Sequence, residues 1–224
     1  MPDDTCKPAL RTALRVHEIG NSSPYQLFFA AKAKSGASFG FMQGDLAAGQ
    51  PVVTRTFRDV MTAAQMAPAD IGTLITRLSV HLIANPLAGP ETAKVNGALA
   101  RGSALVDAMD EAILSDVYNG VDACLRQAGQ HGRSIAPIAQ LYIAMWVNMS
   151  GPPSKMLRWI GGEDPGLRHP IALAPPVIDK PAIESYLQAT DYFVENPRNF
   201  LHMQESAATG AAKLPVTEVT PQPA

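Results

Sequence analysis

The sequence predicts a mainly α-helical fold with a small β-hairpin element, an α+β arrangement in which the helices dominate. Two observations lead to this fold class. Apolar residues recur at intervals of three and four along most of the 224-residue chain, which is the spacing of helix faces buried in a core. Between residues 25 and 43 this period fails, and two short aromatic-rich segments are bounded by Gly, Ser and Pro, which is typical of short strands.

The composition favours one globular domain. Hydrophobic residues make up 46% of the chain and charged residues 17%, which argues against a disordered chain or a long solvated coiled coil. The length is sufficient for a full hydrophobic core. We expect a domain over residues 1–205, followed by a disordered tail over residues 206–224, which are rich in Ala, Thr, Pro and Gly.

Several classes of protein are disfavoured. The net charge is −2 and no run of Lys or Arg is present, whereas a nucleic-acid binder needs a basic surface. No apolar run is long enough to span a membrane. The five histidines lack metal-site spacing, so we expect neither a metal nor a cofactor. We expect a monomer, in which Cys6 and Cys124 either form one disulfide or remain free.

The first predicted helix ends with a glutamate. Pro8 suits its first turn, Leu10 and Leu14 lie on one face, and Gly20 stops it. Glu18 is therefore expected in the last turn. This is the negative end of the helix dipole, which disfavours an ionised carboxylate. Such a position suits a general acid, which must hold its proton until it is needed.

Later helices are predicted over residues 51–64, 70–82, 103–128, 135–149 and 181–195. Asp70 is expected to cap the second of these at its N-terminus. The third carries Gly120, where we expect an interruption. The fourth is apolar nearly all round, which indicates a central buried helix.

Residues 35–45 carry polar side chains on an extended segment. Ser38 and Gln43 offer hydrogen-bonding groups suited to the N-acetyl groups or hydroxyls of a sugar. Gly40 permits close backbone approach. Asp45 is either a second carboxylate that positions water or the cap of a turn after Gly44.

The predicted buried helix supplies a second set of candidates. Asn148 ends an otherwise apolar helix, where a polar residue either faces a substrate or caps the helix. Tyr142 and Trp146 have rings that can stack on sugars, although such residues more often belong to the core. We include all three as candidate substrate-binding residues.

Three patches, taken in order, resemble motifs of the lysozyme-like superfamily, and within it those of goose-type lysozymes and lytic transglycosylases. They are Glu18 at a helix end, residues 40–43 (Gly-Phe-Met-Gln), and residues 148–152 (Asn-Met-Ser-Gly-Pro) leading to residues 158–160 (Arg-Trp-Ile). The resemblance implies a lysozyme-like fold and cleavage of peptidoglycan or a related polysaccharide. It implies that Glu18 is the general acid and base, with Gln43, Asp45 and Asn148 lining the cleft.

The resemblance also bears on where the protein acts. Peptidoglycan is reached at the cell wall, in the periplasm or outside the cell. The N-terminal residues are polar and lack the apolar core of a signal peptide. We therefore expect either that this is the mature form of the protein or that it reaches its target by another route, such as a phage lysis system or a dedicated secretion apparatus.

Three alternatives remain. A chitosanase-like hydrolase would use both Glu18 and Asp45, and a non-catalytic helical module would bind a glycan or a protein without cleaving it. Residues 36–40 (Gly-Ala-Ser-Phe-Gly) match the G-x-S-x-G nucleophile motif of α/β-hydrolases. That motif follows a central strand of a parallel sheet, and too few residues precede Gly36 to supply the earlier strands.

Overall fold

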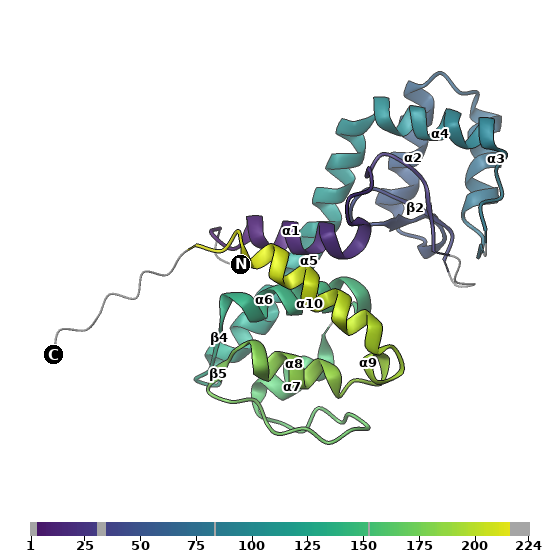
Figure 1. The fold of residues 1–224 in the computed structure, drawn as a ribbon. Coiled ribbons are helices and arrows are strands. Elements are labelled where there is room, and N and C mark those ends of the chain that lie inside the picture. Colours follow the sequence, from purple (N-terminus) through teal and green to yellow (C-terminus); the bar gives the residue numbers. More distant parts are fainter. Residues whose placement is uncertain (1–3, 31–34, 83, 152, 216–224) are drawn as a thin grey trace. The chain divides into compact units, whose positions relative to one another are not determined.

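The computed structural model describes residues 4–30, 35–82, 84–151 and 153–215 (Figure 1). The predicted fold class is confirmed, because the chain is mainly helical and carries a small antiparallel β-sheet. The helices are α1 (Lys7–Ile19), α2 (Pro51–Ala63), α3 (Pro68–Leu78), α4 (Gly89–Arg101), α5 (Ser103–Gln130), α6 (Pro137–Ser150), α7 (Ser154–Gly161), α8 (Lys180–Gln188), α9 (Asp191–Glu195) and α10 (Pro197–Ala211).

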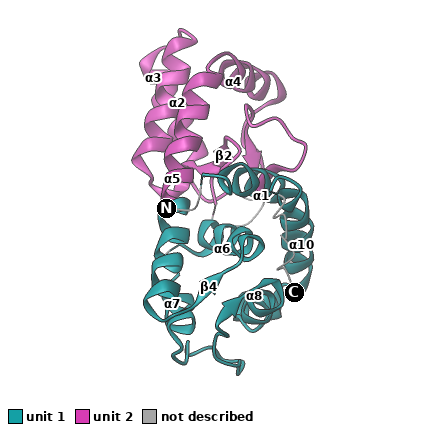
Figure 2. Cartoon of the chain, turned by 90° about the vertical axis from the view of Figure 1, so that its left-hand side faces the viewer, with its two compact units in different colours: residues 1–17, 117–224 teal, residues 18–116 magenta. Residues whose placement is uncertain are grey.

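The chain forms two compact units, where the sequence led us to expect one domain (Figure 2). Unit 1 consists of Met1–His17 and Val117–Ala224, and unit 2 consists of Glu18–Asp116. Unit 2 is therefore a continuous stretch inserted between the two parts of unit 1. The chain passes from one unit to the other inside α1 and again inside α5.

The β-sheet of unit 2 lies in the region where the helical period fails. Its strands are β1 (Phe28–Phe29), β2 (Ala37–Phe39) and β3 (Gly44–Asp45), paired antiparallel in that order. Ser38 lies opposite Phe28 on one side and opposite Asp45 on the other. After β3, the 3-10 helix η1 (Leu46–Ala48) leads towards α2.

Unit 2 has its own hydrophobic core beneath this sheet. Helix α2 packs against both α3 and α4. The ring of Phe39 in β2 contacts the ring of Phe57 in α2, with 5.8 Å between ring centroids. Val53, Leu78 and Leu99 are fully buried in the same cluster. Apolar side chains thus hold the sheet against the helices. Full burial of one such side chain stabilises the folded state by about 1.5–3 kcal/mol.

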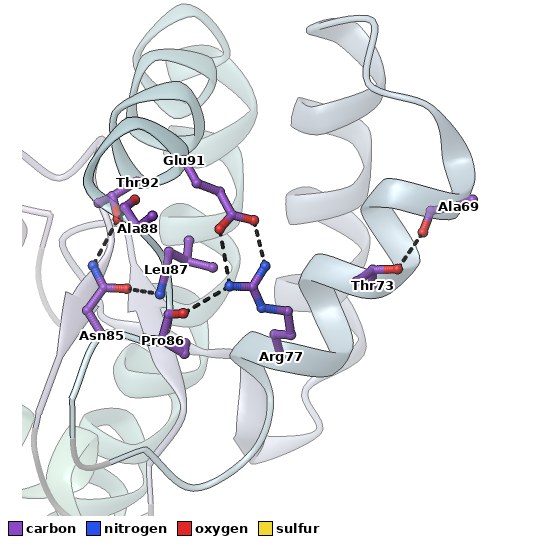
Figure 3. A network of polar contacts seen from close by, with 9 residues as sticks. All are labelled: Ala69, Thr73, Arg77, Asn85, Pro86, Leu87, Ala88, Glu91 and Thr92. Carbon is purple, nitrogen blue, oxygen red and sulfur yellow. Dashed lines mark hydrogen bonds and ion pairs between the residues drawn. The ribbon is translucent and has the colours of Figure 1, made fainter.

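A polar network joins α3 to the start of α4 (Figure 3). Arg77 forms a two-pronged ion pair with Glu91, with N–O distances of 2.7 and 3.1 Å. The same guanidinium donates to the carbonyl of Pro86. The side chain of Asn85 accepts from the amide of Leu87, which fixes the turn before α4. A paired, planar guanidinium holds geometry better than a single lysine contact.

Helix α3 begins earlier than predicted. Its N-cap is Ala67, and Pro68 takes the first helical position. Asp70 is therefore not the cap but lies in the first turn, where its negative charge is favourable to the helix dipole. The fixed φ of proline, which is suited to a first helical position, accounts for the difference.

Helix α6 is the buried helix of unit 1, as predicted. It packs against α8 and α10, and residues 141–145 have no exposed side chain. A parallel pair of short strands, β4 (Ser134–Ile135) and β5 (Val177–Ile178), lies before α6 and α8. Cys6 and Cys124 are both buried, and neither forms a disulfide. Burial raises the pKa of Cys124 to about 12, so this thiol stays protonated.

Helix α5 continues through Gly120, where we expected an interruption. A β-carbon at Gly120 would lie 2.6 Å from a methyl group of Val147 in α6. The glycine therefore allows two helices of unit 1 to approach closely and does not break the helix. The predicted helix over residues 181–195 is divided into α8 and α9, which are separated at Ala189 and Thr190.

The predicted tail over residues 206–224 begins too early. Helix α10 extends to Ala211 because Phe200, Met203 and Ala207 form a buried face at helical spacing. Gly210 lies against α1, since a β-carbon there would lie 2.7 Å from that of Ala13. Residues 216–224 lie outside the described part of the chain.

Candidate functional site

Glu18 lies where the sequence predicted, in the last turn of α1. Its side chain is half-buried. Its backbone carbonyl accepts a hydrogen bond from the side-chain amide of Gln43, at 3.0 Å. The carbonyls of a last helical turn have no partner within the helix, so this contact satisfies one of them. It also ties the first sequence motif to the second, which lies twenty-five positions along the chain.

Gln43 is held in turn by Ser38. The Ser38 hydroxyl donates to Gln43 Oε1 at 2.6 Å, while Gln43 Nε2 donates to Glu18. Both ends of the amide are therefore used, which fixes the orientation of the side chain. The backbone of Gln43 has a φ of 54°, a left-handed conformation that a non-glycine residue rarely adopts. Ser38 and Gln43 thus position the end of α1, in addition to any role towards a ligand.

The turn over residues 40–43 is anchored from α5 by Asp110, a residue that the sequence analysis missed. The Asp110 carboxylate accepts from the amide of Phe41 at 2.9 Å and from that of Met42 at 3.0 Å. Asp110 is fully buried, and its carboxylate would clash with a β-carbon on Gly40. Hydrogen bonds from amides to a carboxylate are stronger than neutral ones, so this anchor is firm.

The sequence did contain a signal for Asp110. The residue follows Val106 by four positions and precedes Leu114 by four, so it falls on the buried stripe of its helix. An aspartate on such a stripe requires hydrogen-bond partners from another segment. The sequence did not show that these partners are the amides of Phe41 and Met42.

Asp45 acts as a cap in this structure. Its Oδ1 accepts from the amide of Ala47 at 2.7 Å and from the amide of Gly36 at 3.0 Å. The first contact makes it the N-cap of η1, and the second connects the segment that precedes β2 to β3. Of the two roles left open by the sequence, the turn cap is the one observed.

The other three candidates lie along α6, in unit 1. The ring of Tyr142 is completely buried, so it offers no face to a sugar, contrary to our expectation. Its hydroxyl donates to Glu184 at 2.6 Å, and Gln204 donates to the same carboxylate oxygen. Burial, together with the Glu184 contact, raises the pKa of Tyr142. Tyr142 is therefore a core residue that joins α6 to α8.

Trp146 and Asn148 are more accessible than Tyr142. Both side chains are half-buried, and Asn148 lies in the last turn of α6. The Trp146 ring lies close to the rings of Tyr192 and Phe193, with centroid distances of 6.3 and 5.6 Å. The structure therefore brings Glu18, Ser38, Gln43 and Asp45 together in unit 2, and it places Tyr142, Trp146 and Asn148 on one helix of unit 1.

His17, the residue before Glu18, forms a pair with His202 within unit 1. The rings of His17 and His202 are stacked at a centroid distance of 5.0 Å, and His17 Nε2 lies 3.2 Å from the sulfur of Met149. Burial and the nearby charge of His202 lower the pKa of His17 to about 4. His17 is therefore neutral at physiological pH.

No metal site is evident in the part of the chain that the structure describes, since no three His, Cys, Asp or Glu side chains gather closely enough to hold an ion. Over the same residues, none of the helices has the length and apolar character needed to cross a membrane. Comparisons with models of protein families, with curated proteins and with solved structures found no match for this chain.

Proposed function

We propose that this protein cleaves the glycan strands of peptidoglycan, with Glu18 as the general acid and base. The observation that carries the proposal is the hydrogen bond from Gln43 to the carbonyl of Glu18. It joins a carboxylic acid at a helix end to a turn on a small antiparallel sheet, and these segments carry the first two motifs of the resemblance. The lysozyme-like motifs and this contact support one another.

In the proposed reaction, the Glu18 carboxyl group gives its proton to the glycosidic oxygen as the bond to the anomeric carbon breaks. The developing positive charge on the sugar is relieved when an oxygen nucleophile bonds to that carbon. In a lytic transglycosylase the nucleophile is a hydroxyl of the same sugar, and Glu18 takes up its proton. The acid is thereby regenerated, and the product carries an anhydro-sugar end.

Asp45 favours this single-acid route over the chitosanase-like alternative. A chitosanase-like hydrolase needs a second carboxylate whose oxygens are available to hold water. One Asp45 oxygen already accepts two backbone amides, which makes the residue part of the turn. We therefore propose the transglycosylase, with peptidoglycan as the substrate and no nucleic-acid partner.

The test is digestion of purified cell wall by the intact protein and by Glu18→Gln, followed by mass spectrometry of the products. The amide keeps the shape of the side chain but cannot donate the proton, so turnover should fall by about 10²–10⁴-fold. Glu205→Gln is the matched control, because Glu205 is an exposed glutamate on α10 and should leave turnover unchanged.

The products separate the competing readings. Anhydro-sugar ends support the transglycosylase, whereas reducing ends show a hydrolase and overturn the transglycosylase. A protein that binds cell wall but releases no product is a binding module. Full activity in Glu18→Gln would remove Glu18 from the mechanism.

A further inference from the structure

A pocket of unit 1 combines aromatic rings with a partly exposed carboxylate. Its volume is about 300 Å³, at the lower end of the range of about 300–1,000 Å³ for small-molecule sites. Residues from the end of α6, the start of α7 and the α8–α9 junction line it. The lining residues that bear on its chemistry are Trp146, Ser150, Ser154, Lys155, Asp191 and Tyr192.

The aromatic wall of this pocket is held in place by its neighbours. Trp146 lies edge-on to Tyr192, and both side chains are half-buried, which leaves part of each ring accessible. The Tyr192 hydroxyl accepts a hydrogen bond from Asn199 at 2.7 Å. Phe193 packs against both rings from within the core. The wall is thus a preformed apolar surface and needs little ordering when a ligand binds.

The polar feature beside this wall is Asp191. Its Oδ1 atom is buried and has no hydrogen-bond partner among the described residues. Oδ1 forms an ion pair with Arg168, whose Nε lies 3.6 Å away, beyond hydrogen-bond distance. The Asp191 side chain as a whole is 44% exposed, so Oδ2 is the oxygen that a ligand can reach. A hydroxyl or amide hydrogen of a ligand can donate to Oδ2.

We propose that this pocket binds one neutral pyranose unit of a glycan. A pyranose has an apolar face of C–H groups, which suits the aromatic wall, and a rim of hydroxyls, which suits Asp191. An anionic ligand would be repelled by the Asp191 carboxylate, and a purely apolar ligand would remove water from the exposed part of that carboxylate without a hydrogen bond in return. Lys155 donates to the carbonyl of Gly166, which leaves further ammonium hydrogens for sugar oxygens.

The pocket is built without Glu18, because every lining residue belongs to unit 1. Only the choice of an acetylated sugar as probe rests on the proposed function. The test therefore uses the full chain with Glu18→Gln, so that the probe is not consumed. The probe is tetra-N-acetylchitotetraose, and cellotetraose serves as the comparison because it has the same linkage without the acetamido groups.

The two tryptophans provide a reporter and an internal reference. Trp159 is buried and its indole N–H donates to the carbonyl of Ala172 at 3.0 Å, so its NMR signal should stay fixed. Protein labelled with ¹⁵N at tryptophan should show two indole signals, assigned with Trp146→Phe. We expect the Trp146 signal to move in a saturable manner with tetra-N-acetylchitotetraose. Movement with cellotetraose as well would show that the pyranose ring is sufficient.

Three variants test the role of Asp191. Asp191→Ala should weaken binding about tenfold, the loss expected for a hydrogen bond to a charged acceptor. Glu195→Ala removes an exposed carboxylate of the same short helix and should bind as the parent does. Arg168→Gln removes the ion pair but keeps the acceptor, so it should also bind normally. It thereby separates the loss of the acceptor from any loss of fold.

The inference is overturned if neither sugar moves the Trp146 signal, if the Trp159 signal moves equally, or if a folded Asp191→Ala binds as the parent does. These results are independent of catalysis. A protein in which Glu18→Gln retains full cell-wall cleavage would refute the proposed function while leaving sugar binding at Trp146 intact. Absence of sugar binding at Trp146, together with normal cell-wall cleavage by the parent protein, would refute the sugar site and leave the proposed function intact.

Discussion

The carboxylate of Asp110 fills the space that a β-carbon on Gly40 would need. The two residues belong to different segments, one in the middle of α5 and the other at the turn after β2. Their close approach brings the amides of Phe41 and Met42 within hydrogen-bond distance of the carboxylate. The conformation of the turn that presents Gln43 therefore depends on a glycine and an aspartate together.

Gly40→Ala should lower the free energy of unfolding more than Gly49→Ala does. Both glycines have positive φ, 80° and 69°, which costs an L-residue about 1–2 kcal/mol. A methyl group at Gly49 meets open space, whereas one at Gly40 meets a buried, hydrogen-bonded carboxylate. Overpacking should add about 1–3 kcal/mol. Denaturant unfolding of the two variants measures the difference, and equal losses would contradict the account.

Asp110→Ala should destabilise unit 2 because it leaves the amides of Phe41 and Met42 without their acceptor. Each unsatisfied buried amide costs about 1–3 kcal/mol, so the free energy of unfolding should fall by about 2–6 kcal/mol. Asp59→Ala on the exposed face of α2 is the control and should change it little. If Asp110→Ala unfolds at the same denaturant concentration as the parent, the turn is held by something else.

Asp45→Asn should retain both stability and cell-wall cleavage, because asparagine is as good an N-cap as aspartate. Asp45→Ala should instead lose about 1 kcal/mol of stability, since the amide of Ala47 loses its acceptor. Thermal melts and product analysis check the two effects separately. An Asp45→Asn protein that is folded and binds glycan but is inactive would revive the two-carboxylate mechanism.

The stability of the protein should fall between pH 6.5 and 4 through His17. Burial, with the nearby charge of His202, lowers the pKa of folded His17 from 6.5 to about 4. In this interval the unfolded chain binds the additional proton, so the contribution of neutral His17 is complete above about pH 6.5 and is lost as the pH falls. The full change is about 3 kcal/mol.

The measurement is the free energy of unfolding as a function of pH for the parent and for His17→Phe, which removes the titrating group. The variant should show a smaller slope over this interval. His81→Gln, at an exposed position, should retain the slope of the parent. A slope unaffected by His17→Phe would assign the pH dependence to other groups.

Two glycines of α5 should respond to alanine in opposite directions. Gly120→Ala places a methyl group against Val147 and should cost about 1–3 kcal/mol. Gly129 has nothing within 4 Å of the added carbon, so Gly129→Ala should stabilise the helix by about 0.5–1 kcal/mol. The double variant Gly120→Ala, Val147→Ala should recover part of the lost packing. Calorimetry of the parent and of these three variants measures the changes in stability.

Local patterns were sufficient to predict much of the helical structure. The face of Leu10 and Leu14 and the stop at Gly20 predicted α1 closely, and the continuous apolar run predicted the burial of α6. These features arise within a few residues of one another. The interruption predicted at Gly120 was wrong, because the role of this glycine depends on its contact with Val147 in another helix, which local patterns do not report.

The candidate site was predictable in part. Glu18, Ser38 and Gln43 were selected from short motifs, and the hydrogen bonds now connect them. Asp110 was missed because its partners lie 68 and 69 positions away, a separation that no local pattern reports. Tyr142 was chosen for its ring, although the ring is buried and only its hydroxyl makes a polar contact.

The contact between Gly210 and Ala13 has a consequence for the order in which the chain folds. Synthesis delivers the first part of α1 long before α10, so this segment must wait for almost the whole chain before it meets its partner. Residues 18–116 are complete much earlier and contain their own core. On the ribosome, the inserted unit can therefore collapse first, while the N-terminal segment of α1 remains exposed until the C-terminal helix emerges.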